Sequence, residues 1–168
     1  MSDKQNKIAS ENMSMNFSKG WGIILYQALM FFLLIGFSID GLNIVAPAFS
    51  ESSGVDYPSV LSMATIAGFI GIVVYIFAGR INVKIGPRLM SGGCLIGAGL
   101  SYIFLGHTST LVTYCIALTL VTCFINSAAY IAGNTLIAQW FPKKKGLANG
   151  FTTMGHNCGS AFYVPLVS

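Results

Sequence analysis

The sequence predicts an all-α polytopic membrane helix bundle, and three observations carry that prediction. First, 54% of the 168 residues are hydrophobic and only 8% are charged, whereas soluble domains carry about 25% charged residues. Second, the chain contains five long apolar runs, and about 20 apolar residues suffice for a helix to cross a hydrocarbon core about 30 Å thick. Third, its 9 Lys and Arg residues cluster on alternate joints between these runs.

The expected transmembrane helices cover residues 21–41, 60–79, 88–106, 111–140 and 146–168, behind a tail at residues 1–20. Short polar joints at 47–57, 80–87, 107–110 and 142–145 contain the proline, glycine, serine and charged residues that end helices. A backbone in lipid must satisfy its own hydrogen bonds, so these runs are expected to be helices. Consecutive helices are then antiparallel neighbours in one partial transmembrane domain.

The distribution of charge predicts the orientation. Basic residues lie before the first run, around the second joint and after the fourth run, while the other two joints carry only Glu51 and Asp56 as charges. The positive-inside rule then predicts a cytoplasmic amino terminus. The absence of a transit peptide predicts a plasma membrane or bacterial inner membrane. The cytoplasmic joints account for the net charge of +4, so the expected partner is the lipid bilayer and not nucleic acid.

The second joint carries the most informative motif, GRINVKIGPR at residues 79–88. A tight turn between two helices needs glycine where the backbones meet, and basic residues suit the headgroup level. The motif resembles the signature between helices two and three of the Major Facilitator Superfamily, matched at Gly79, Lys84, Gly86 and Arg88. Val83 stands where the family carries an acidic residue thought to hold the two halves together, so the resemblance implies that this contact is missing.

Residues 134–150, NTLIAQWFPKKKGLANG, resemble the joint between helices four and five in the oxalate/formate and monocarboxylate branch of that family. The resemblance implies a twelve-helix transporter whose solute site lies between two six-helix halves near the bilayer midplane. The chain would then be an amino-terminal fragment that works with a missing carboxyl-terminal half. The implied function is secondary active transport of a small solute by alternating access, with an organic anion suggested by the branch and no cofactor.

Polar groups inside a span are costly, so they face a bundle interior or a watery path. Asn126, Tyr130 and Asn134 follow one another at intervals of four residues on one face of the fourth span. Helix four lines the cavity in the resembled family, which makes these residues candidates for the solute cavity. The alternative is that they form hydrogen bonds to neighbouring helices.

Two further pairs are candidates for the cavity. His156 and Ser160 lie on a polar stripe of the fifth span, and His156 could carry a proton or contact an anion; alternatively it is a neutral histidine bonded to an adjacent helix. Asp40 and Asn43 could face the cavity from the first helix, or Asp40-Gly41 could simply form a turn.

Small residues predict close helix packing and carry no chemistry. The expected stripes are Ala64, Gly68 and Gly71 on the second span and Gly93, Gly97 and Ser101 on the third. A second hypothesis follows from them: a small membrane-embedded scaffold or self-assembling interaction protein. An enzyme is not expected, because the spans contain neither an HExxH nor a GxSxG motif and offer no metal-ligand cluster.

Overall fold

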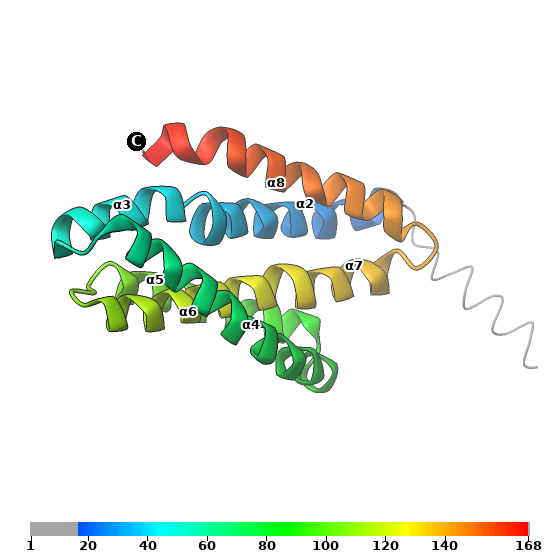
Figure 1. Cartoon of the computed structure of the whole chain (residues 1–168). Coiled ribbons are helices and arrows are strands. Elements are labelled where there is room, and N and C mark those ends of the chain that lie inside the picture. The colour runs from blue at the N-terminus through cyan, green and yellow to red at the C-terminus, as the bar shows by residue number, and fades with distance from the viewer. Residues whose placement is uncertain (1–16, 168) are drawn as a thin grey trace, which may run out of the picture.

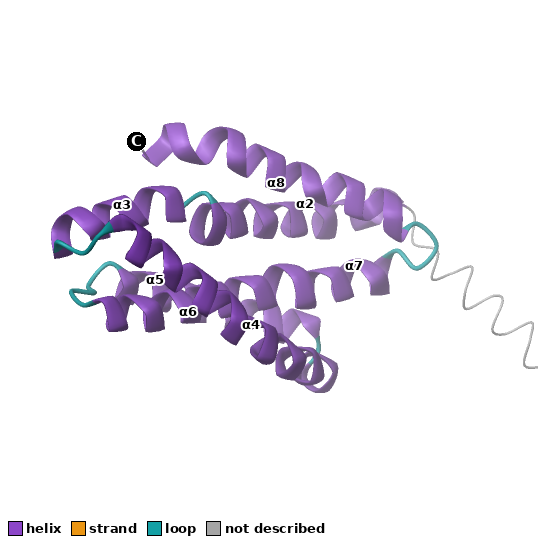
Figure 2. Cartoon of the chain, in the orientation of Figure 1, coloured by secondary structure: helices purple, strands orange, loops and turns teal. Residues whose placement is uncertain are grey.

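The computed structural model describes residues 17–167, and every element in that range is a helix. Figures 1 and 2 show the helices running back and forth along one long axis. This arrangement confirms the predicted all-α bundle.

The first rod, meaning the series of helices that run in one direction before the chain turns back, is longer than expected. It consists of α2 (Phe17–Leu34), the π-helix η1 (Ile35–Ile39) and α3 (Leu42–Ser53), with a turn at Asp40–Gly41. The predicted joint at 47–57 is therefore helical up to Ser53, which corrects the sequence interpretation. Pro47 lies inside α3, where it deprives the Asn43 carbonyl of its helical donor, and Asn43 is exposed to solvent or lipid headgroups. Gly54 ends α3 with a left-handed φ of 70°.

The second and third rods meet in a turn of one residue. α4 spans Tyr57–Ile85 and α5 spans Pro87–Leu105, so the predicted joint at 80–87 is helical except at Gly86. Gly86 has φ 85° and ψ 152°, a conformation that is essentially restricted to glycine. At the other end of α4, the Asp56 carboxylate accepts a hydrogen bond from the Ser59 backbone N–H at 3.1 Å and so caps the helix.

The fourth rod is a continuous helix with an internal change of pitch. It contains α6 (Leu111–Asn126), the π-helix η2 (Ser127–Gly133) and α7 (Asn134–Trp140). A capping box formed by Thr110 and Thr113 begins it. The last rod, α8, spans Lys145–Val167.

The bundle is organised around two close packings. α8 lies along α2, and α6 lies against both α4 and α5. Glycine permits the first packing, because a Cβ at Gly155 would overlap the Ala28 backbone of α2 and a Cβ at Gly159 would meet Ile35 at 3.0 Å. The predicted stripes are only partly right: Gly97 is crowded by Phe124 of α6, but Gly71 is crowded only by Tyr75 of its own helix, and Gly68 and Gly93 face open space.

Three helical segments of the described chain are long and apolar enough to cross a membrane: Tyr57–Ile85, Pro87–Leu105 and Leu111–Trp140. Gly20–Leu34 is apolar but shorter. Many large apolar side chains on α4 and α5 are exposed, as expected for a surface that faces lipid.

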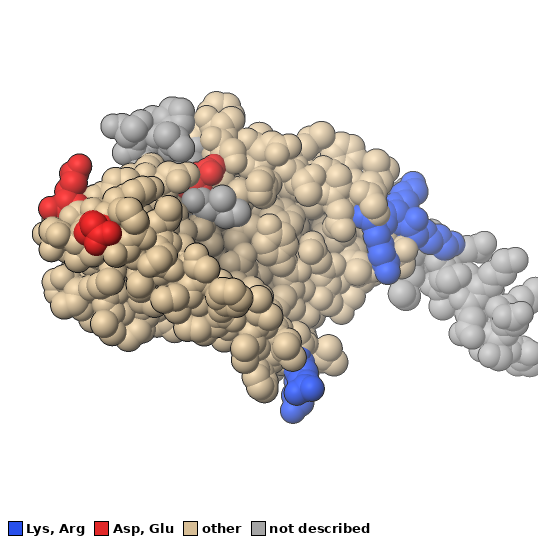
Figure 3. Space-filling model, viewed as in Figure 1, with Lys and Arg blue, Asp and Glu red and all other residues tan. Residues whose placement is uncertain are grey.

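The described charges lie at opposite ends of the bundle (Figure 3). Glu51 and Asp56 belong to the end where α3 and α4 meet, and Asp40 lies further back along the first rod, in the turn before α3. Basic residues of the α4–α5 turn and of the α7–α8 joint lie at the other end. The long sides between them are almost free of charge.

Candidate functional site

The π-helix of the fourth rod lies at the centre of the candidate site. Wide π turns occur frequently at functional positions. Here the widening coincides with a contact to α2: the fully buried Gln27 donates a hydrogen bond from Nε2 to the Ala129 carbonyl at 2.7 Å. The Gln27 carboxamide also fills the space beside Gly133, where a Cβ would overlap it. Gln27 thus joins α2 to η2.

Sequence reasoning missed Gln27. Its Oε1 atom is buried without a hydrogen-bond partner among the described residues, which is costly and calls for an explanation. The signal was present, because Gln27 is an uncharged polar residue in the middle of the first apolar run. Nothing in the sequence, however, identified its partner 102 positions away.

Asn126, Tyr130 and Asn134 share the less buried face of the fourth rod. Asn126 and Asn134 are half-buried and Tyr130 is 42% exposed, whereas Ala128, Ala129, Ala132 and Gly133 are buried. The Asn126 amide donates to the Thr122 carbonyl of its own helix at 2.7 Å. The structure therefore places the three predicted residues together on one face.

Two aromatic residues border this face. The Tyr130 ring meets the Phe31 ring of α2 edge to face, with centroids 5.4 Å apart. The Tyr75 hydroxyl of α4 donates a long hydrogen bond, 3.5 Å, to the Thr122 carbonyl, the same carbonyl that accepts from the Asn126 amide. Tyr75 is a second polar neighbour that the sequence did not single out, since it lies in a run of apolar residues.

α8 presents two different faces. Gly155 and Gly159 face α2, and each is followed by a predicted polar residue, His156 and Ser160. His156 is half-buried and Ser160 is exposed, so the pair lies beside the packed seam. Among the described residues of α8, Thr152 and Thr153 donate side-chain hydrogen bonds to backbone carbonyls of their own helix.

The remaining predicted pair lies elsewhere in the first rod. Asp40 is half-buried in the turn after η1, where its backbone N–H donates to the Ile35 carbonyl at 2.9 Å. Asn43 is exposed at the start of α3. Both precede the acidic end of the bundle, and the turn reading of Asp40-Gly41 matches the observed geometry.

The signature residues at the basic end are held to the fourth rod. Arg88 lies with its guanidinium carbon 5.7 Å from the centre of the Trp140 ring, a cation–π contact. The Asn82 amide donates to the Thr135 hydroxyl at 2.9 Å. Lys84 is exposed and Gly79 is half-buried with open space around it. The Arg88–Trp140 and Asn82–Thr135 contacts hold the α4–α5 turn against α7. Val83, which is 86% exposed, contributes no charge to this turn.

The long apolar helices, the exposed apolar surface and the polarised ends define a multi-pass helical membrane protein. The sequence model of the Major Facilitator Superfamily matches residues 10–168. The chain belongs to this family, which comprises transporters and not enzymes. Among the described residues there is also no group of three or more His, Cys, Asp or Glu side chains that could hold a metal ion.

One curated relative is an oxalate:formate antiporter from Oxalobacter formigenes, 29% identical over 150 residues. The alignment covers 88% of this chain and 35% of the relative. The chain therefore spans about a third of that relative's length. No solved structure matches the chain.

Proposed function

We propose that this chain forms the amino-terminal part of a secondary transporter that moves a small organic anion by alternating access of two halves. The observation that carries the proposal is the polar face on the fourth rod, Asn126, Tyr130 and Asn134, in a chain of this family. In such transporters the solute site lies near the bilayer midplane, between the two halves. This face would form the wall that the present half contributes.

The chemistry of the face suits a carboxylate solute. Tyrosine hydroxyls and asparagine amides donate hydrogen bonds, and an anion accepts them. Within the apolar body of the bundle His156 is the described side chain that can become a cation, since the described Lys and Arg side chains lie at the basic end. A histidine can change charge near physiological pH. The relative's oxalate:formate exchange supports small dicarboxylates and monocarboxylates as the first solutes to test.

The test is exchange in proteoliposomes that contain the full-length protein and are loaded with unlabelled formate. Uptake of labelled oxalate is expected only when the inside contains a counter-anion. His156→Gln should reduce exchange by an order of magnitude or more, since an interaction of a charged group with an anion is worth about 1.5–3 kcal/mol. His107→Gln is the matched control, because His107 is exposed in a loop and its ring contacts its own helix.

Two results would contradict the proposal. Exchange that is equally rapid in His156→Gln and in His107→Gln would remove His156 from the site. Complete absence of uptake for every carboxylate, together with uptake of a neutral solute, would overturn the substrate class while leaving the family membership intact.

We also propose that the basic end faces the cytoplasm. The charge separation in Figure 3, taken with the positive-inside rule, supports a cytoplasmic position for the α4–α5 turn and the α7–α8 joint. In a background without native cysteines, Lys143→Cys should resist a membrane-impermeant thiol reagent added to intact cells, and Glu51→Cys should react. The reverse pattern would invert the topology.

A further inference from the structure

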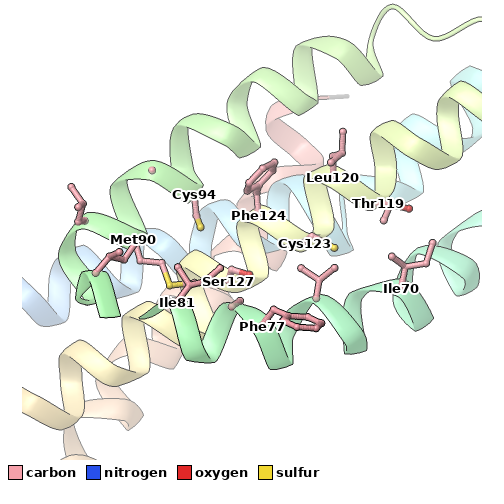
Figure 4. A pocket seen from close by; sticks show the side chains of 15 residues that line it. Ile70, Phe77, Ile81, Met90, Cys94, Thr119, Leu120, Cys123, Phe124 and Ser127 are labelled. Carbon is pink, nitrogen blue, oxygen red and sulfur yellow. The ribbon is translucent and has the colours of Figure 1, made fainter. Parts of the chain in front are cut away.

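The outer faces of α4, α5 and α6 enclose an apolar groove with a volume of about 490 Å³. Figure 4 shows side chains from all three helices converging on it. Its walls include Phe77, Ile81, Met90, Cys94, Leu120 and Phe124. Hydroxyl groups come only from Thr119 and Ser127 among its lining residues, and the Thr119 hydroxyl already donates to the Cys115 carbonyl. The groove thus offers a hydrocarbon surface.

A polar cavity continues the groove at its basic end. This second space, about 320 Å³, is lined by Gly86, Pro87, Arg88, Gln139 and Trp140. It shares Ile85 and Leu89 with the groove. The apolar groove and the polar mouth are therefore adjacent at the α4–α5 turn.

The mouth is positively charged. Arg88 borders it, and the exposed Lys84 and Arg80 lie on the last turns of α4. Of the acidic residues of the described chain, Glu51 and Asp56 lie at the opposite end of the bundle and Asp40 lies in the turn between η1 and α3. Val83 is 86% exposed between Arg80 and Lys84 and carries no charge, whereas a carboxylate at this position would offset the positive charges around it. No described acidic side chain therefore neutralises the mouth.

We propose that the groove and its mouth together bind one anionic phospholipid. The acyl chain would lie between α4 and α5 on α6, and the phosphate would lie at Arg88 with Lys84 beside it. Arginine binds phosphate oxygens through paired N–H groups, and basic residues at the membrane surface attract anionic lipid. Trp140 holds the Arg88 side chain at the level where interfacial aromatics lie. The inference is independent of the transported solute.

The test uses the purified full-length protein and phosphatidylglycerol that carries a photoactivatable group on its acyl chain. Crosslinked peptides from α4, α5 and α6 are expected, and unlabelled phosphatidylglycerol should compete better than phosphatidylcholine. The double variant Lys84→Gln/Arg88→Gln should weaken competition about 30-fold, which is about fivefold for each charge removed. Lys143→Gln/Lys145→Gln is the matched control, since both lysines are exposed at the same end but do not line the groove.

A second pair of variants tests the groove without touching charge. A Cβ meets nothing within 4 Å at Gly93 or at Gly68, and only Gly93 lines the groove. Gly93→Leu is expected to abolish most acyl crosslinking, whereas Gly68→Leu should leave it unchanged. This pair decides the question if the charge variant fails to fold.

Three results would overturn the proposal. The first is that phosphatidylcholine competes as well as phosphatidylglycerol. The second is that the Lys143→Gln/Lys145→Gln variant loses as much binding as the Lys84→Gln/Arg88→Gln variant. The third result is a protein crosslink in the groove, from a disulfide or bifunctional reagent at Cys94, to another part of the full-length chain or to a second copy. That result would show that protein occupies the groove in place of lipid.

Discussion

Replacing Gly155 by alanine should separate α8 from α2. A Cβ at Gly155 would stand 2.6 Å from the carbonyl carbon of Ala28 and closer still to its oxygen. The obstacle is backbone, which cannot rotate away as a side chain can, so the two helices must move apart. Overpacking of this kind costs about 1–3 kcal/mol. The cost opposes the gain in helix propensity from glycine to alanine, about 1 kcal/mol.

Gly150→Ala provides the matched control on the same helix, because a Cβ there meets nothing within 4 Å. The propensity gain is common to both variants, so the difference between them isolates the steric cost of about 1–3 kcal/mol. Unfolding of the full-length protein in increasing sodium dodecyl sulfate, followed by tryptophan fluorescence, measures it. Trp21 of α2 is a suitable reporter, since its ring lies 5.5 Å from that of Phe151 on α8. Equal stability of the two variants would refute the close packing.

Two further predictions concern the basic end of the bundle. Gly86→Ala should destabilise the protein by about 1–3 kcal/mol, because φ 85° and ψ 152° strain the backbone of an alanine. Gly79→Ala should not destabilise it, because Gly79 is helical and a Cβ there has open space. Equal unfolding midpoints of the two variants would contradict this prediction. A double-mutant cycle of Asn82→Ala and Thr135→Val should give a coupling of about 0.6 kcal/mol for their hydrogen bond. A coupling indistinguishable from zero would show that the contact contributes nothing.

The sequence was sufficient for the parts of the fold that depend on local signals. Apolar runs long enough to cross the bilayer predicted the helices, and the joint predicted at 80–87 contains Gly86, the one residue between α4 and α5. The Thr110 cap lies at the predicted third joint. The end of α3 was not predictable from the same rules, because a proline usually interrupts a helix, whereas Pro47 lies inside α3 and removes only the hydrogen bond to the Asn43 carbonyl.

Features that depend on tertiary contacts could not be read from the sequence. The π-helix around Tyr130 forms where Gln27, from a distant part of the chain, bonds to the Ala129 carbonyl. Likewise Gly155 and Gly159 are crowded only because α2 lies against them, whereas Gly68 and Gly93, equally suited to packing by composition, face open space. The common face of Asn126, Tyr130 and Asn134 was predicted, since four-residue spacing is a local property.

We propose that the face formed by Asn126, Tyr130 and Asn134 lines a water-filled solute cavity. The most direct test is the reactivity of Tyr130→Cys, in a cysteine-free full-length protein, toward a small hydrophilic thiol reagent with and without solute. We expect Tyr130→Cys to react with the hydrophilic reagent, and to react more slowly when a transported carboxylate saturates the site. Reaction only with a lipid-soluble reagent, unaffected by any solute, would show that this face contacts lipid and would contradict the claim.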